Sequence, residues 1–108
     1  SASRDMQAYI ALSDQLPTRA SIEANPDSVT LPTSPAAICI LVFKAASVCA
    51  RDTFGTWMRF IRRLPNEAQA LFINTVLEIS AKKAWVLSHP AFVTWAREHQ
   101  YMFAGLKG

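Results

Sequence analysis

The most conspicuous pattern in the chain is an apolar run, AAICILVFKAASVCA, at residues 36–50, which holds a single charge, Lys44. This run is shorter than the ~20 residues that a membrane-spanning helix needs, and a charge near its middle would be costly in a bilayer. Ser34 is a suitable N-cap, and Pro35 suits the first position of a helix. The pattern therefore predicts a helix at about 35–51 in the centre of a packed core, with other helices around it.

Two further segments precede this run. Residues 4–16 predict a first helix, because apolar side chains recur at helical spacing and a proline follows directly. Residues 17–34 form a Pro-rich connector with one predicted helical turn at 19–24, and its plainest interpretation is a tether on which the first helix packs or swings. The apolar side chains of the first helix are Met6, Tyr9, Ile10 and Leu16.

The second half of the chain predicts three more helices. Residues 53–64 carry an apolar face opposite a basic one, and Pro65 then makes a tight join to a largely apolar helix at 66–79. Residues 80–89 predict a short helix or turn. The last helix, at 90–103, begins with Pro90 after a cap at Ser88 or His89, which repeats the start of the apolar helix.

These elements predict an all-α protein, a compact array of about five or six helices around the central apolar helix. The length indicates one domain, divided into an N-terminal helix at 1–16, the Pro-rich connector at 17–34 and a helical core at 35–108. Whether the chain is a fragment of a larger protein stays open. The residues that we expect to be mostly buried are Ile38, Leu41, Val42, Ala45, Phe72, Val76, Trp95 and Phe103.

The two cysteines favour a reducing compartment. Cys39 and Cys49 would lie about 15 Å apart along one helix, whereas a disulfide needs Cα atoms within roughly 7 Å. We therefore expect two reduced, buried thiols. The first residues also lack the apolar run of a secretory signal, and both observations indicate a cytoplasmic protein.

The sequence contains no clear motif for catalysis, for metal binding or for cofactor binding. Cys39 and Cys49 fall in an apolar helix, His99 lies on the apolar face of the last helix, and His89 stands where a cap is expected. No CxxC, HxxxH or acidic cluster is present for a metal. Gly55 is the only glycine in the body of the chain, so a phosphate-binding loop is absent. The sequence thus predicts no enzyme and no cofactor.

A basic helix face is the strongest functional candidate. The net charge is +3, and residues 51–108 hold all of the positive excess. Arg59, Arg62 and Arg63 have the i, i+3, i+4 spacing of one helix face, and guanidinium groups suit phosphates and carboxylates. The alternative interpretation is an ordinary solvated face. With its neighbours, the candidate patch for an anionic partner consists of Arg51, Arg59, Arg62, Arg63, Lys82 and Lys83.

We expect a non-catalytic helical macromolecular-interaction module of a larger protein or assembly. It would bind a protein partner through the basic face or through an apolar groove beside the first helix. One alternative is a nucleic-acid-binding domain that uses the same arginines. The stretch 64–96 resembles a helical appendage of a phage or plasmid NTPase, which implies a second alternative, a helical lid or regulatory domain. That stretch has no nucleotide motif, and the oligomeric state stays open.

Overall fold

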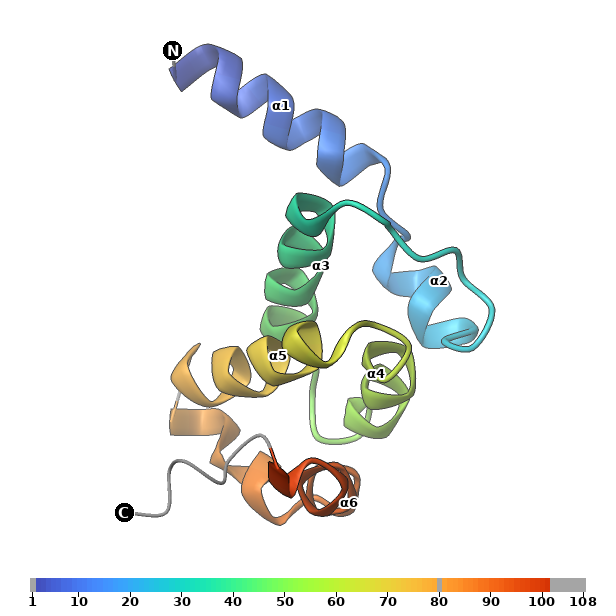
Figure 1. Ribbon diagram of the computed structural model, residues 1–108, viewed down its shortest axis with the longest axis vertical. Helices are drawn as coiled ribbons and strands as arrows, with labels where there is room; N and C mark the ends of the chain where they lie inside the picture. The colour runs from blue at the N-terminus through green and yellow to red at the C-terminus, as the bar shows by residue number, and fades with distance from the viewer. Residues whose placement is uncertain (1, 80, 102–108) are drawn as a thin grey trace.

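The protein is built from helices throughout the part of the chain that the structure, a computed structural model, describes: residues 2–79 and 81–101 (Figure 1). The predicted all-α class with five or six helices is confirmed. None of these helices is both long and apolar enough to cross a membrane within the described residues. In chain order the elements are α1 (Ala2–Asp14), α2 (Arg19–Ala24), α3 (Pro35–Val48), α4 (Phe54–Ile61), α5 (Asn66–Ile79), the 3-10 helix η1 (Ala81–Ser88) and α6 (Pro90–Glu98).

Local capping explains where the helices begin. The hydroxyl of Ser34 accepts the N–H of Ala37 at 3.1 Å at the start of α3, and His89 Nδ1 accepts the N–H of Ala91 at 3.1 Å at the start of α6. In both helices a proline occupies the first turn, where its missing N–H costs nothing. Thr18 caps α2 in the same manner. The predicted helix starts at Ser34–Pro35 and His89–Pro90 are therefore confirmed.

Four helices end earlier than their apolar patterns suggest: α1 ends at Asp14 and α4 at Ile61, and the central and last helices also stop short. The central helix was expected to reach about 51, but α3 ends at Val48, and the next residues form a turn in which Thr53 Oγ1 accepts the N–H of Ala50 at 3.0 Å. The last helix ends at Glu98 instead of continuing to 103. The hydrogen bond between the Ala50 N–H and Thr53 Oγ1 fixes the turn between α3 and α4. The Thr53 side chain is thereby engaged in the turn and does not cap α4.

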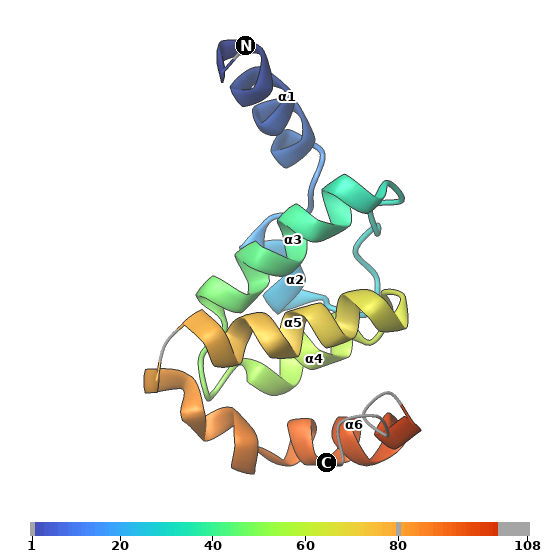
Figure 2. The ribbon, with the colours of Figure 1, turned by 60° about the vertical axis from the view of Figure 1, so that its left-hand side comes forward.

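The core forms where α3 crosses α5, with α4, η1 and α6 packed around the crossing (Figure 2). One face of α3 is fully buried, but the opposite face is open: Phe43 is 51% exposed. The apolar run is therefore covered on one side only, and its other side faces the first helix and solvent. Ile38 is only partly buried, and Phe103 lies outside the described residues. The expected burial is confirmed for Leu41, Val42, Ala45, Phe72, Val76 and Trp95.

The first helix projects from the rest of the molecule in both ribbon views (Figures 1 and 2). It contacts α3 near its C-terminal end, where Leu12 is partly buried and Leu16 is buried. The apolar side chains nearer its N-terminus are half exposed or more: Met6, Tyr9 and Ile10 are 60%, 54% and 50% exposed. Helical spacing predicted the shared face correctly, and the described part of the chain leaves that face half exposed or more.

Candidate interaction surfaces

The arginines of the predicted basic patch form intramolecular contacts. Arg59 makes an ion pair with Asp27, and Arg63 Nη1 donates to the carbonyl oxygen of Pro26 at 2.9 Å. Both acceptors lie in the connector just after α2, so these two side chains fasten that connector to α4. Arg59 is exposed, as the pattern predicts, yet it is engaged with its own chain.

Arg62 makes a different contact, to α6. Its two terminal nitrogens donate to the two carboxylate oxygens of Glu98 at 2.8 and 3.0 Å, a bidentate pair. The hydrogen bond from Arg62 lowers the pKa of Glu98, and the same bond raises the pKa of Arg62. Because both groups are exposed, solvent screens the pair and its contribution to the stability of the fold is small. Its main effect is to orient α6 against α4.

The remaining members of the candidate patch are dispersed. Lys83 Nζ donates to the carbonyl oxygens of Ala46 and Ser47, both at 2.9 Å, and thereby caps the C-terminus of α3. Arg51 is exposed in the α3–α4 turn and has no bonding partner among residues 2–79 and 81–101. The side chain of Lys82 lies outside the described part. Four of these basic residues thus make contacts within the described part of the chain: Arg59, Arg62, Arg63 and Lys83.

A buried glutamine that the sequence analysis did not single out links three elements. Gln69, in the first turn of α5, is 5% exposed. Its Nε2 donates to the carbonyl oxygens of Leu64 at 2.7 Å and Arg62 at 3.2 Å, beyond the end of α4. Its Oε1 accepts the indole N–H of Trp95 on α6 at 2.8 Å. A polar residue on the apolar side of a helix was the available signal for this role.

A second polar link joins α2 to the core. The indole N–H of Trp57, on α4, donates to Glu23 Oε2 at 2.9 Å, and Arg19 Nε donates to the same oxygen at 3.3 Å. Trp57 is almost fully buried, so Glu23 satisfies a donor that would otherwise have no acceptor in the core. Together with the arginine contacts, this link holds the connector firmly against α4.

The candidate catalytic groups are placed apart from one another. His99 is buried, its ring is stacked on Trp95 with centroids 4.4 Å apart, and its Nδ1 lies 2.7 Å from the Trp95 carbonyl oxygen. Cys49 is buried, and burial raises the pKa of its thiol against the opposing effect of Lys83. The expectation of two buried thiols is wrong for Cys39, which is exposed on the uncovered side of α3.

This difference predicts selective labelling of the two cysteines. A maleimide reagent will modify Cys39 in the native protein within minutes, because its thiol is accessible. Cys49 will react only after denaturation, because it is buried and its raised pKa lowers the fraction of thiolate. Mass spectrometry of the labelled peptides measures both rates, and a Cys39→Ser variant should lose the fast phase. Equal native rates for the two thiols would contradict this placement.

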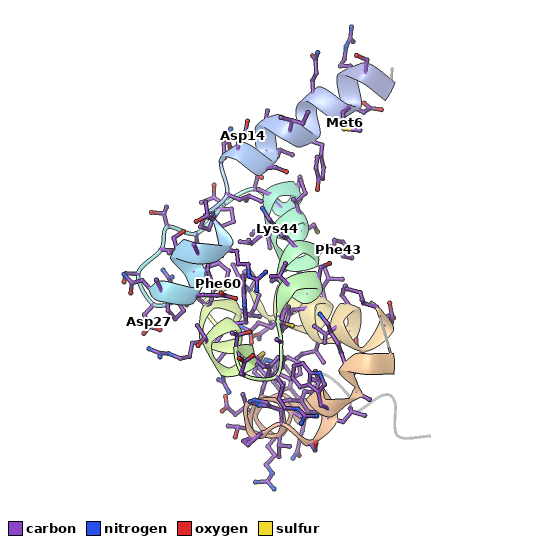
Figure 3. The ribbon with its side chains drawn as sticks, turned by 180° about the vertical axis from the view of Figure 1, so that it is seen from behind. Met6, Asp14, Asp27, Phe43, Lys44 and Phe60 are labelled. Atoms are coloured by element: carbon purple, nitrogen blue, oxygen red, sulfur yellow. The ribbon has the colours of Figure 1, made fainter. Side chains whose placement is uncertain are left out.

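An unpartnered apolar surface lies between α1 and α3. A groove of about 350 Å³ is lined by Tyr9 and Ser13 of α1 and by four residues of α3. Met6 and Phe43 point to the same side of the two helices (Figure 3). We call the α1–α3 surface this groove together with the adjoining exposed side chains of α1. The residues of the α1–α3 surface are Met6, Tyr9, Ile10, Ser13, Ile40, Phe43, Lys44 and Ser47.

Comparison of the chain with protein-family models, with curated proteins and with solved structures found no match.

Proposed function

We propose that this protein is a non-catalytic helical module that binds a protein partner through the α1–α3 surface, as part of a larger protein or assembly. The observation that carries the proposal is the exposure of four large apolar side chains on two adjacent helices. They are Met6, Tyr9, Ile10 and Phe43, each exposed by half or more.

The energetics of a projecting helix support this interpretation. An isolated helix shorter than about 12–15 residues is marginal in water, and α1 has 13 residues. Only its C-terminal end is anchored, through Leu12 and Leu16. The outer turns of α1 therefore gain little stability from packing within their own chain. A partner that covers their apolar stripe would stabilise them. Contiguous exposed apolar patches of a few hundred Å² typically mark such binding sites.

The basic residues give less support to the nucleic-acid alternative. The guanidinium groups of Arg59, Arg62 and Arg63 each have an acceptor within the chain. These contacts already occupy part of the donor set of each guanidinium group, so a phosphate would have to share or compete for those donors. A cytoplasmic setting, in which the exposed thiol of Cys39 stays reduced, belongs to the same proposal.

Site-specific photo-crosslinking in the cells that make the protein tests this proposal. A photoreactive phenylalanine analogue at position 43 should give a discrete cross-linked protein species. The same analogue at Thr94, which is exposed on α6, is the matched control and should give none. Absence of cross-links at position 43, or equal cross-links at both positions, would contradict the proposed surface.

The two alternatives predict other outcomes of the same study. A nucleic-acid-binding domain would bind labelled DNA or RNA at low salt, with affinity that falls as salt rises, while position 43 stays unlinked. A lid or regulatory domain of an NTPase would cross-link to a segment that carries a phosphate-binding loop. Identification of the linked peptide by mass spectrometry separates these outcomes.

A further inference from the structure

We propose that the occupant of the α1–α3 surface is a second copy of this chain, bound across a two-fold axis so that α1 of each copy lies in the groove of the other. This inference rests on the proposed function above, and it names the partner for the same surface. Most soluble homo-oligomers are two-fold dimers, in which one self-complementary patch serves both copies.

The chain carries both halves of such a patch. The groove between Tyr9 and Phe43 is concave, and the outer part of α1 is a free-standing apolar rod that projects beyond the body (Figures 1 and 2). Met6 and Ile10, four residues apart, lie on one side of that rod. Since α1 is anchored only at its C-terminal end, its outer turns extend past its own groove and are free to enter another.

The charges on the two halves are complementary. Lys44 is the only charged residue that lines the groove, and it has no ion pair among the described residues. The α1 helix carries Asp5 and Asp14, for which the described part of the chain likewise provides no ion pair. At 100° per residue the two acids stand on opposite sides of α1: Asp14 lies next to the Met6–Ile10 stripe, and Asp5 lies on the far side, where α1 also carries Arg4. A two-fold arrangement in which the Met6–Ile10 stripe enters the groove brings Lys44 of each copy near Asp14 of the other α1, which favours this pairing.

The size of the surface indicates a weak dimer. Four half-exposed apolar side chains form a small patch on each copy, and a patch of a few hundred Å² falls below the ~800 Å² per partner of a stable interface. We therefore expect a Kd of roughly 10–100 μM, in the range of transient contacts. The protein would be a monomer when dilute and a dimer at high local concentration, as within an assembly.

Sedimentation velocity over protein concentrations of about 5–500 μM tests the dimer. The mass should rise from the monomer value of 12.0 kDa towards twice that value. Phe43→Asp should stay monomeric throughout while its circular dichroism remains helical, because Phe43 is half exposed in the monomer. Thr94→Asp, on the exposed side of α6, is the control and should dimerise as the wild type does.

A charge exchange tests the orientation of the two copies. Lys44→Asp should weaken self-association at least tenfold, and so should Asp14→Lys, because each places like charges together. An equimolar mixture of the two variants restores both opposite-charge contacts and should associate with near wild-type affinity. Recovery in the mixture alone is the signature of the proposed pairing.

Failure of this inference is distinguishable from failure of the proposed function. A wild type that stays at 12.0 kDa at every concentration, or a Phe43→Asp variant that still dimerises, overturns the second copy as occupant. In that case cross-linking at position 43 to a different protein would leave the proposed function standing. Absence of both dimer and cross-link would overturn the two together.

Discussion

Replacement of Val42 by Asp will unfold the protein. Val42 is 0% exposed and lies on the buried face of α3, against the crossing with α5. A carboxylate there would have neither water nor a partner, and an unpaired buried charge costs several kcal/mol. A domain of this size has a total stability of roughly 5–15 kcal/mol. We therefore expect loss of the cooperative melt and of most helical signal in far-ultraviolet circular dichroism.

The adjacent residue provides the matched control. Phe43→Asp introduces the same charge one position along the same helix, on the side that is 51% exposed. It should keep the helical spectrum and a cooperative transition, with a stability loss of at most about 1–2 kcal/mol. Similar melting temperatures for the two variants would contradict the assignment of the buried and open faces of α3.

Replacement of Gln69 by Leu will cause the second-largest loss of stability. The change preserves bulk but removes the acceptor of the Trp95 indole N–H and the donor to the Leu64 carbonyl oxygen. Each buried polar group left without a partner costs about 1–3 kcal/mol, so the free energy of unfolding should fall by roughly 2–5 kcal/mol. Urea titration, followed by tryptophan fluorescence and by circular dichroism, measures this difference.

Asn74→Leu is the control for this substitution. It makes the same exchange of an amide for an aliphatic side chain on α5, at a position that is exposed. Its unfolding free energy should stay within about 0.5 kcal/mol of the wild type. A Gln69→Leu variant as stable as Asn74→Leu would show that Gln69 does not hold α4 and α6 together.

Local sequence signals predicted the starts of α3 and α6 well because each of these starts is encoded within a few residues. Ser34 and His89 both precede a proline, and both cap the helix that follows. The burial of Val42 and Phe72 also followed from helical periodicity. These features depend on neighbours in sequence, so a single chain is enough to find them.

The functional interpretation of the arginines depended on contacts that the sequence does not reveal. Arg59 and Asp27 are separated by 32 residues, and Arg62 and Glu98 by 36. Spacing places three guanidinium groups on one face, but it cannot show that acceptors from the connector and from α6 meet them there. The exposure of Cys39 was missed for a related reason: an apolar run does not show which of its sides remains uncovered.

Hydrogen exchange along α1 most directly tests the claim that a binding partner covers the α1–α3 surface. In dilute protein the amides of residues 6–10 should exchange rapidly, because that part of the helix has no tertiary support. In concentrated protein, or with the partner that cross-links at position 43, we expect exchange there to slow several-fold while exchange in α5 stays unchanged. Exchange at residues 6–10 that is the same in all three conditions would contradict this claim.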